Sequence, residues 1–471
     1  MEETSILAGL LAGLQLVEHE LLLFAAFWFV VGAADEMAVD LAYLSLRWTG
    51  AIRKPPVSAY EEHAPLQGRI AVFVPAWHES DVLGLMIRHM LLVWPQADLT
   101  LYVGCYRNDA ATIAAAMKGA EGDPRLRIVI NDRDGPTTKA DCLNRLYRAM
   151  SDDERRSGKG VSGVILHDAE DMVHPAGLVA IDRGLSRADF VQLPVRPEPQ
   201  AASRWIAGHY ADEFAEAHGK TLVVRDALGA AIPAAGVGCG FSREALGELA
   251  SAREATGGPF AEECLTEDYE LGLLVSRGGA RGTFLRLRDR YGDLVATRSY
   301  FPATLDEAVR QKTRWIHGIA FQGWDRLGWG DGLIDRWMTI RDRRGPFMAI
   351  VLAAAYLLLA IEGVLALARL SGWSSPFATP ELLKTILVIC FAAVVWRALW
   401  RFVFTATEYG LREGLFAVLR IPLANIIMIM AGRRALMAYV RTLLGHAPSW
   451  DKTHHGFHPT MPPPSGQAAL R

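Results

Sequence analysis

The hydrophobic residues of this chain are concentrated in long stretches near its two ends, and this distribution limits what the chain can fold into. Met348–Leu367 contains a single charged residue, Glu362, and about 20 mostly apolar residues suffice for a helix to cross a bilayer. Leu21–Leu46 and Thr385–Phe404 are comparable but carry polar interruptions. The sequence therefore predicts three membrane-spanning helices, one before and two after a long, more polar middle.

A fourth apolar segment, Leu415–Met430, differs from these three. It is shorter and contains Arg420, Pro422 and Asn425, which are unfavourable in a helix that is surrounded by lipid. The pattern predicts a segment that lies at the membrane interface or re-enters the membrane instead of crossing it.

Basic residues predict the orientation in the membrane. No Lys or Arg precedes Arg47, whereas Arg53 and Lys54 follow soon after it, so the positive-inside rule places residue 50 onward in the cytoplasm. Two further spans return the chain to the same side. The first stretch lacks the basic region that begins a cleaved signal peptide. The acidic residues of that stretch are predicted at its cytoplasmic mouth: Asp35, Glu36 and Asp40.

Charge and cysteine content exclude several classes of protein. The formal net charge of −3 argues against nucleic-acid binding, which usually needs a strongly basic surface. The five cysteines are scattered without a CxxC pair, so the sequence predicts neither a disulfide framework nor a zinc site, and a reducing compartment fits best.

Short strand-like and helix-like segments alternate between about residues 66 and 300. The expected strands cover 69–75, 99–103, 127–130 and 163–166, and the expected helices include 81–93 and 110–117. Such alternation predicts a doubly wound α/β sheet, mainly parallel, which binds ligands beyond the carboxyl ends of its strands. The charged stretch Ser151–Gly160 is interpreted as a solvated loop.

Three carboxylates, Asp168, Glu170 and Asp171, follow the fourth expected strand. Carboxylates this close repel one another unless a cation or solvent relieves the repulsion. A hard divalent cation such as Mg²⁺ or Mn²⁺ would relieve it and bind a diphosphate as well. An acidic turn without a metal is the alternative interpretation.

A second acidic group stands at a predicted helix start. Thr266 is expected as the N-cap, with Glu267 and Asp268 in the first turn and the helix end near Gly278–Gly279. A helix N-terminus favours the ionised carboxylate that a general base requires at neutral pH. Acids that only complement the helix dipole are the alternative.

The segment Leu305–Leu327 has the periodicity of an amphipathic helix. Gln311, Arg314 and Trp315 share one of its faces, away from the apolar stripe. Trp stacks on sugar rings, and Gln and Arg hydrogen-bond to hydroxyl or phosphate groups. A surface cation–π pair is the alternative.

Taken in order, these segments resemble the family-2 glycosyltransferases, which have the GT-A fold. The resemblance rests on PAWHE after the first strand, followed by KADCLN, DAED, TED and QKTRW, over roughly residues 66–320. The DAEDMVHP run, the apolar helices and the C-terminal SWDKTHH also resemble the membrane-bound bacteriophage adsorption protein B type, which is similar to cellulose-synthase-like enzymes.

The resemblance implies a role for each matching residue on the donor side. Asp168 and Glu170 occupy the two metal-ligand positions, with Asp171 as an alternative second ligand. Asn108 and Asp109, after the second expected strand, stand where the family usually has Asp-Asp-Gly. The residues implied at the uridine and the diphosphate are Pro75, Ala76, Glu79, Asn108, Asp109 and Lys139.

On the other side of the donor, the resemblance implies that Asp268, beside Glu267, is the catalytic base. The loop Gly238–Gly240, which includes Cys239, resembles the acceptor-side loop of the family. The residues implied at the border of acceptor and diphosphate are Gln311, Arg314 and Trp315.

The implied reaction is a single displacement that inverts the sugar configuration. The donor would be a UDP-linked nucleotide sugar, the acceptor a glycan or lipid-linked molecule, and the cofactor Mg²⁺ or Mn²⁺. The implied place is the bacterial inner membrane, in the synthesis of surface or exported polysaccharide together with outer-envelope export components. Two alternatives remain open, a metal-dependent nucleotidyltransferase and a non-catalytic membrane receptor or assembly protein.

The predicted organisation has four parts. A membrane segment covers 1–50, a catalytic domain 51–345, membrane and interfacial helices 346–436, and a cytoplasmic tail 437–471. The tail resembles the gating loop of cellulose-synthase-like enzymes, which implies a lid over the donor site. The residues implied in this lid are Trp450, Lys452, Thr453 and His454.

Overall fold

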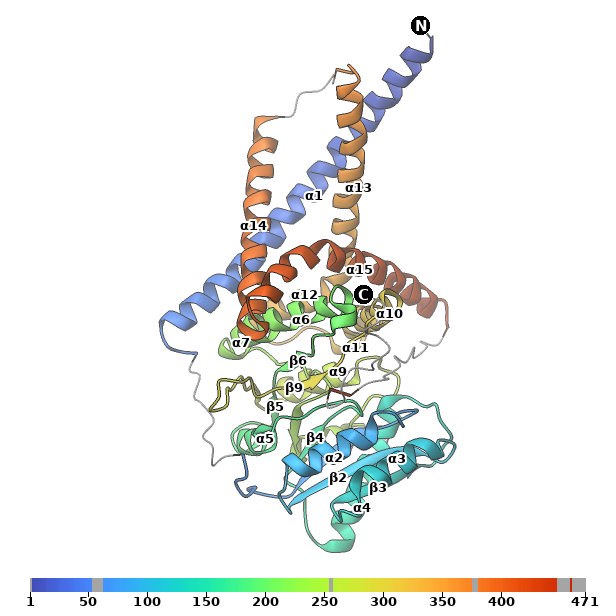
Figure 1. Ribbon diagram of the computed structural model, residues 1–471, viewed down its shortest axis with the longest axis vertical. Coiled ribbons are helices and arrows are strands. Elements are labelled where there is room, and N and C mark those ends of the chain that lie inside the picture. The colour runs from blue at the N-terminus through green and yellow to red at the C-terminus, as the bar shows by residue number, and fades with distance from the viewer. Residues whose placement is uncertain (1, 53–61, 254–256, 375–379, 447–457, 460–471) are drawn as a thin grey trace.

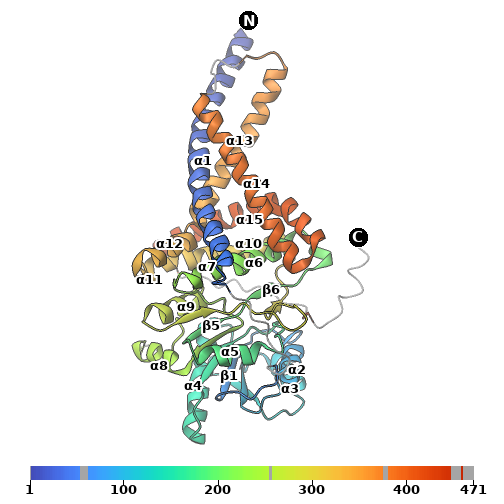
Figure 2. The same cartoon turned by 90° about the vertical axis from the view of Figure 1, so that its left-hand side faces the viewer.

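The computed structural model describes residues 2–52, 62–253, 257–374, 380–446 and 458–459. A mixed α/β domain forms one end of the molecule, and a bundle of long helices projects from it (Figure 1). Figure 2 shows the same division from the side, with shorter helices between the two parts.

A seven-stranded sheet forms the centre of the α/β domain, with strand order β3-β2-β1-β4-β7-β5-β8. All neighbours are parallel except β7, which runs antiparallel to β4 and β5. Strands β6 and β9 form a separate parallel pair. The strands are β1 Ile70–Pro75, β2 Leu99–Tyr106, β3 Leu126–Asn131, β4 Gly163–Leu166, β5 Phe190–Gln192, β6 Val195–Pro197, β7 Cys239–Ser242, β8 Gly282–Phe284 and β9 Thr297–Ser299.

The predicted α/β fold with a mainly parallel sheet is confirmed. Each of the four expected strands coincides with one of β1–β4 to within a few residues, because each is an apolar run that ends in turn residues or polar residues. The two expected helices correspond to α2 (Leu83–Val93) and α3 (Ala110–Ala120).

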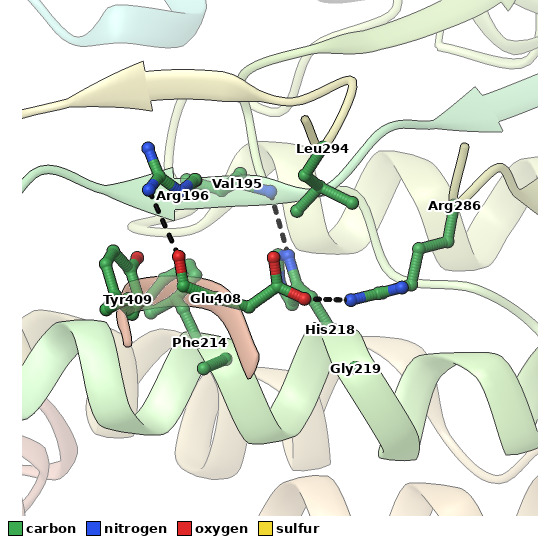
Figure 3. Close-up of a pocket in the computed structure, with 10 residues that line it drawn as sticks. Val195, Arg196, Phe214, His218, Gly219, Arg286, Leu294, Glu408 and Tyr409 are labelled. Atoms are coloured by element: carbon green, nitrogen blue, oxygen red, sulfur yellow. Dashed lines mark hydrogen bonds and ion pairs between the residues drawn. The ribbon is translucent and has the colours of Figure 1, made fainter. Parts of the chain in front are cut away.

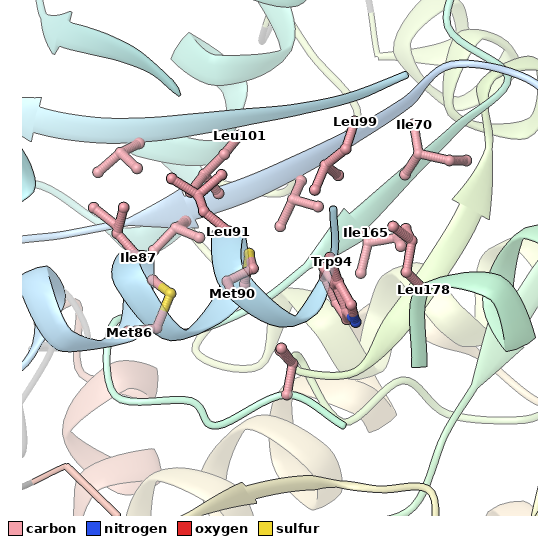
Figure 4. Close-up of a cluster of buried hydrophobic side chains, with 14 of the residues drawn as sticks. Ile70, Met86, Ile87, Met90, Leu91, Trp94, Leu99, Leu101, Ile165 and Leu178 are labelled. Atoms are coloured by element: carbon pink, nitrogen blue, oxygen red, sulfur yellow. The ribbon is translucent and has the colours of Figure 1, made fainter. Parts of the chain in front are cut away.

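Helices cover both faces of the sheet. On one face lie α2 and α5 (Gly177–Leu185), and Figure 4 shows Met86, Met90 and Trp94 packed toward Leu99 and Ile165 of the strands. Each fully buried Leu, Ile or Met contributes about 1.5–3 kcal/mol of hydrophobic stabilisation. On the other face lie α4 (Lys139–Ser157), α8 (Arg243–Ala252) and α9 (Glu267–Arg277).

The interpretation of Ser151–Gly160 as a loop is wrong. Residues 151–157 are the last two turns of α4, which ends where Gly158 adopts a left-handed conformation. Arg155 and Arg156 pair with acids one turn earlier in the same helix. The stretch is charged because it is a helical end that projects into solvent, and charge alone does not separate such a helix from a loop.

A layer of shorter helices joins the α/β domain to the bundle. The expected helix 305–327 is present as α10 (Leu305–Ile316), a π-helical stretch η5 (His317–Gln322) and α11 (Gly323–Leu327). The others are η2 Ala201–Ser203, α6 Ile206–Glu216, η3 Ala217–Thr221, α7 Leu222–Ala227 and α12 Gly332–Arg343.

Four helices of the described residues are long and apolar enough to cross a membrane: α1 (Glu2–Trp48), α13 (Gly345–Leu370), α14 (Glu381–Tyr409) and α15 (Leu411–Leu443). The first three contain the three predicted spans and project together from the α/β domain (Figure 1). By length and composition alone α15 also qualifies, whereas the sequence predicted an interfacial segment there.

The course of α15 differs from that of the other three helices. It runs across the base of the bundle, over the short helices of the α/β domain (Figure 1). The buried Arg420, in the first third of α15, donates hydrogen bonds of 2.7 Å to both carboxylate oxygens of Asp212 in α6. This ion pair fastens α15 to the α/β domain, since breaking it would leave a buried charge without its partner.

Further ion pairs connect the bundle to the domain. Asp35 and Glu36 of α1 pair with Arg341 and Arg344 at the α12–α13 junction. At the end of α14, Glu408 pairs with Arg286, as Figure 3 shows together with its neighbours. The acidic residues at the domain end of α1 and α14 therefore hold these helices to the rest of the molecule through ion pairs.

Candidate active site

The polar loops that follow β1 and β2 meet at one edge of the sheet, as expected for parallel strands. The Asp109 carboxylate accepts hydrogen bonds from the backbone N–H of His78 (2.7 Å) and of Thr112 (3.3 Å). The backbone N–H of Glu79 donates to the Thr112 hydroxyl at 3.0 Å. Asp109 thus caps α3 and holds the loop after Pro75 and Ala76, so its carboxylate is committed to the loop structure.

Asn108 holds a third loop in the same place. Its side-chain amide donates to the Gly135 carbonyl at 2.8 Å and accepts from the Gly135 N–H at 2.9 Å. A Cβ at Gly135 would lie 2.3 Å from the ring of Trp77, which stacks on His78. Sequence reasoning did not single out Trp77, although an aromatic residue directly after the first strand was the available signal.

Lys139 stands at the first position of α4 because the Thr138 side chain caps that helix. Its ammonium lies 2.6 Å from a carboxylate oxygen of Asp168, beyond the end of β4. Burial disfavours the charged ammonium, but Asp168, Glu267 and Asp268 outweigh this effect and raise the pKa of Lys139. One lysine thus interacts with both acidic motifs that the sequence singled out.

In the turn after β4, the carboxylates of Asp168, Glu170 and Asp171 have different surroundings. Asp171 is buried, and its side chain accepts from His167 Nδ1 at 2.8 Å and from the Asp168 backbone N–H at 3.0 Å. Burial together with Asp168 and Glu79 raises the pKa of the Glu170 carboxyl well above its ordinary value. Only Asp168 of the three is partly exposed.

Within the described ranges, no group of three or more His, Cys, Asp or Glu side chains lies close enough to hold a metal ion by itself. Mg²⁺ sites commonly use one or two carboxylates, with substrate phosphates and waters as the other ligands. Asp168 and the adjacent Glu170 meet that smaller requirement. The donor set therefore fits a cation that binds together with a diphosphate.

Glu267 and Asp268 occupy the first turn of α9, as predicted. Burial raises the pKa of Asp268, while Lys139 and Arg314 act to lower it. Burial and the Asp268 charge also raise the pKa of Glu267. The helix N-terminus was expected to favour the ionised form, but desolvation is the larger effect here.

The Asp268 carboxylate packs against a glycine that sequence reasoning missed. A Cβ at Gly236 would lie 2.1 Å from an Asp268 carboxylate oxygen, and Gly236 has a φ of +77°. Both conditions favour glycine. The loop of Gly236 is braced by the buried Gln192, which donates to the Val237 carbonyl at 3.0 Å and accepts from the Ala235 N–H at 2.8 Å.

The start of α9 rests on two other contacts. Thr266 precedes the helix as expected, but its hydroxyl makes no capping hydrogen bond. Instead its side chain packs against Gly318 of η5, where a Cβ would lie 2.4 Å from the hydroxyl oxygen. Asn144 of α4 hydrogen-bonds the Phe260 carbonyl (2.9 Å) and N–H (3.0 Å), which holds the chain leading to α9.

Gly238 and Cys239 end this loop and enter β7. Gly238 has a φ of +58°, and a Cβ there would lie 2.3 Å from the Thr297 hydroxyl. The Cys239 thiol is buried near Asp268, Lys139 and Asp168, and burial raises its pKa. It remains a thiol at neutral pH and is no activated nucleophile.

The three residues singled out on α10 have different surroundings. Arg314 lies close enough for its charge to lower the pKa of both Glu267 and Asp268. Gln311 Oε1 is buried and accepts no hydrogen bond from the described residues. The Trp315 ring packs among Tyr210, Phe214 and Phe301, so it lies in an aromatic cluster instead of on a polar face.

Trp315 also borders a cavity of about 540 Å³ between the α/β domain and the long helices. Its lining contains charged residues, such as Lys312 and Arg341, and apolar residues, such as Leu352 and Met428. Its lining comes from α6, α10, η5, α12, α13, α14 and α15. A cavity of this size is in the range of ligand-binding pockets.

The predicted lid residues Trp450, Lys452, Thr453 and His454 lie outside the described residues, so the lid stays a prediction. After residue 446 the structure describes His458 and Pro459, and His458 lies at the turn after β4.

A mainly parallel sheet with an acidic turn after β4 and an acidic helix start facing one lysine defines a GT-A glycosyltransferase fold. The family model described as glycosyltransferase like family 2 matches residues 67–318. The chain belongs to this family.

Two curated relatives match most of the chain. Bacteriophage adsorption protein B of Escherichia coli (strain K12) and bacteriophage N4 adsorption protein B of Escherichia coli O157:H7 are each 33% identical over 482 residues, which cover 96% of this chain. The chain spans 63% of the length of each relative.

Solved structures are more distant. The mannosyltransferase PcManGT from Pyrobaculum calidifontis, in complex with GDP-Man and Mn²⁺, is 16% identical with a TM-score of 0.48, over 84% of this chain and 99% of that one. Glucosyl-3-phosphoglycerate synthase from Mycobacterium tuberculosis, in complex with Mn²⁺, UDP and phosphoglyceric acid, is 18% identical with a TM-score of 0.32, over 54% and 78%.

Proposed function

We propose that the protein is an inverting glycosyltransferase that moves a sugar from a UDP-linked donor to a glycan or lipid-linked acceptor at the bacterial inner membrane. The observation that carries this proposal is the meeting of Lys139, Asp168 and Asp268 at one edge of the sheet. These groups belong to three separate segments, and together they offer a cation, a metal-binding carboxylate and a base.

On the donor side, the loops after β1 and β2 would hold the nucleotide. Asn108 and Asp109 hold these loops together through the contacts described above, and Trp77, which packs edge-on against Tyr106, would offer its ring to the nucleotide base. Lys139 would neutralise the diphosphate. Asp168, with Glu170, would hold Mg²⁺ or Mn²⁺, which supplies electrostatic stabilisation of the leaving diphosphate when bound.

Asp268 would remove the proton from the attacking acceptor hydroxyl. Its carboxylate is held over Gly236, and its raised pKa brings it closer to the proton affinity that a general base needs near neutral pH. Arg314 faces the same carboxylates and would help to bind the diphosphate. Attack opposite the leaving group would invert the sugar configuration.

The acceptor would approach from the cavity beside Trp315. The cavity is lined by α10, which also carries Arg314, and by the long helices α13, α14 and α15, and its mixed charged and apolar lining suits an amphipathic molecule. The basic residues around the predicted spans favour a cytoplasmic catalytic domain. The product would then be made next to the membrane, where envelope components for export could receive it.

The names of the two Escherichia coli relatives favour a second candidate, a role in bacteriophage adsorption. Such a role requires no catalysis if the protein itself is a receptor or assembly partner. It is also compatible with catalysis if the surface glycan is what the phage recognises.

A donor screen with detergent-solubilised full-length protein tests the proposal. Each nucleotide sugar is supplied with Mn²⁺, and release of nucleoside diphosphate is measured. Turnover of one donor with release of the nucleoside diphosphate supports a glycosyltransferase. A nucleotidyltransferase would instead break the donor between its two phosphates and release a sugar 1-phosphate. A folded protein that turns over no donor would support the non-catalytic receptor.

A further inference from the structure

The turn after β4 is held at its backbone by ring nitrogens from outside the turn. His89 Nε2 hydrogen-bonds the Val173 carbonyl at 2.9 Å, and Trp94 Nε1 donates to the His174 carbonyl at 3.0 Å. Both rings come from α2 or the residue that follows it. The Met172 carbonyl accepts from the Arg298 N–H at 3.0 Å. Three consecutive carbonyl groups of this turn are therefore paired.

The carbonyl before these three, that of Asp171, is bonded by a residue from the other end of the chain. His458 Nε2 lies 3.2 Å from the Asp171 oxygen, and the His458 side chain is completely buried. Because a carbonyl oxygen can only accept, Nε2 carries the hydrogen. The ring also lies beside His89, with 6.5 Å between the ring centroids.

Asp171 connects His458 with Asp168, the candidate metal ligand. Its backbone carbonyl is bonded by His458, and its side chain accepts from the Asp168 N–H and from His167. A shift of the Asp171 backbone would therefore move the residue that orients Asp168. A protein binds its metal less tightly when the groups that orient the ligating side chains are removed.

We propose that His458 is a positioning residue of the donor site, which holds Asp168 in place through Asp171. This inference rests on the proposed function. It means that the family-matched region 67–318 does not contain its complete donor site, because one supporting contact comes from beyond the last long helix. The same contact would make donor binding depend on the C-terminal segment.

The test compares three variants of the full-length protein in detergent. His458→Ala removes the ring, whereas His458→Gln keeps an N–H donor of similar reach. His446→Ala is the matched control, because His446 belongs to the same C-terminal region but is exposed at the end of α15. The measurements are KM and kcat for the donor found in the screen, and the Kd of UDP with Mn²⁺ by calorimetry.

We expect His458→Ala to raise the donor KM and the UDP Kd about tenfold, the usual size of one lost hydrogen bond. We expect the kcat of His458→Ala to change less than its KM. For His458→Gln and His446→Ala, KM and Kd should stay within about twofold of wild type. Added imidazole should partly restore the donor affinity of His458→Ala. A purely structural role would lower the melting temperature without imidazole rescue and without a selective change in KM. Unchanged KM and Kd in His458→Ala would overturn the inference.

Hydrogen exchange separates failure of this inference from failure of the proposed function. If wild type turns over no donor, the proposed function fails. The inference is then decided by backbone amide exchange in residues 168–176. Faster exchange there in His458→Ala but not in His446→Ala upholds it, and equal exchange in both overturns it.

Discussion

Lys139 Nζ lies 2.6 Å from Asp168 Oδ1, and this contact joins the start of α4 to the turn after β4. The two residues are far apart in the sequence, but β3, β2, β1 and β4 are neighbouring parallel strands, so the segments that follow β3 and β4 lie at one edge of the sheet. A nucleoside diphosphate that binds there would replace Asp168 as the partner of Lys139. Asp168 would then be available to a cation. The ion pair is therefore compatible with a site in which Lys139 pairs with the diphosphate and Asp168 with the cation once donor and metal are bound.

We predict that Gly236→Ala lowers kcat by at least about tenfold, because its Cβ would push the Asp268 carboxylate out of place. Gly229→Ala is the matched control. Gly229 has a similar φ of +73°, but its Cβ would meet no atom within 4 Å. Both variants carry the same backbone strain, so equal loss of kcat in the two would show that strain alone is responsible.

We predict that Asp268→Asn reduces transfer by at least about 100-fold, the lower range for loss of a general base. Asn keeps the shape but cannot accept the proton. The UDP affinity should stay near that of wild type, since Asp268 is not expected to contact the nucleotide. Steady-state kinetics and calorimetry measure the two quantities, and a variant with more than about a tenth of wild-type activity would exclude Asp268 as the base.

We predict that Arg314→Met moves the acidic limb of the pH–kcat profile upward by about 0.5–1 pH unit. Arg314 lowers the pKa of Asp268, so its removal raises that pKa further. A base must be ionised, and activity is lost as the pH falls through its pKa. Arg314→Lys keeps the charge and should leave the limb near its wild-type position. An unshifted limb in Arg314→Met would argue against Asp268 as the titrating group.

We predict that UDP binds at least about tenfold more tightly with Mn²⁺ than in EDTA, because a cation bridges carboxylate and diphosphate. Asp168→Asn should remove most of this difference. Asp171→Asn should change it less, since Asn keeps one oxygen that can accept from the Asp168 N–H. Calorimetry of wild type and both variants in the two buffers gives the six affinities. Equal affinity of wild type in the two buffers would exclude metal-assisted donor binding.

We predict that filling the cavity beside Trp315 blocks the acceptor and spares the donor. Ala424→Phe would place a ring inside the cavity, whereas Leu419→Phe places one on the exposed face of the same helix. Transfer should fall at least about tenfold in Ala424→Phe only, while donor hydrolysis by water persists. Equal transfer in both variants would place the acceptor elsewhere.

Much of the fold followed from local patterns in the sequence. The apolar runs that became β1–β4 and the long apolar helices were predictable, because burial in a sheet or a bilayer needs continuous hydrophobic segments. The pattern of charged residues predicted secondary structure less reliably than the apolar runs did. Residues 151–157 were predicted as a loop but form the exposed end of α4, since a solvated helix and a solvated loop have similar compositions.

For the candidate site, the residue types and their order along the chain could be predicted from local motifs: Lys139, Asp168, Asp268 and Arg314. What each of these residues contacts became clear only from the fold. Asp171 looked like a metal ligand but is held by His167, and Gly236 gained its importance from the carboxylate packed on it. The physical reason is that desolvation and hydrogen bonding depend on neighbours in space. A contact such as that between His458 and Asp171 leaves no periodic or local signal in the chain.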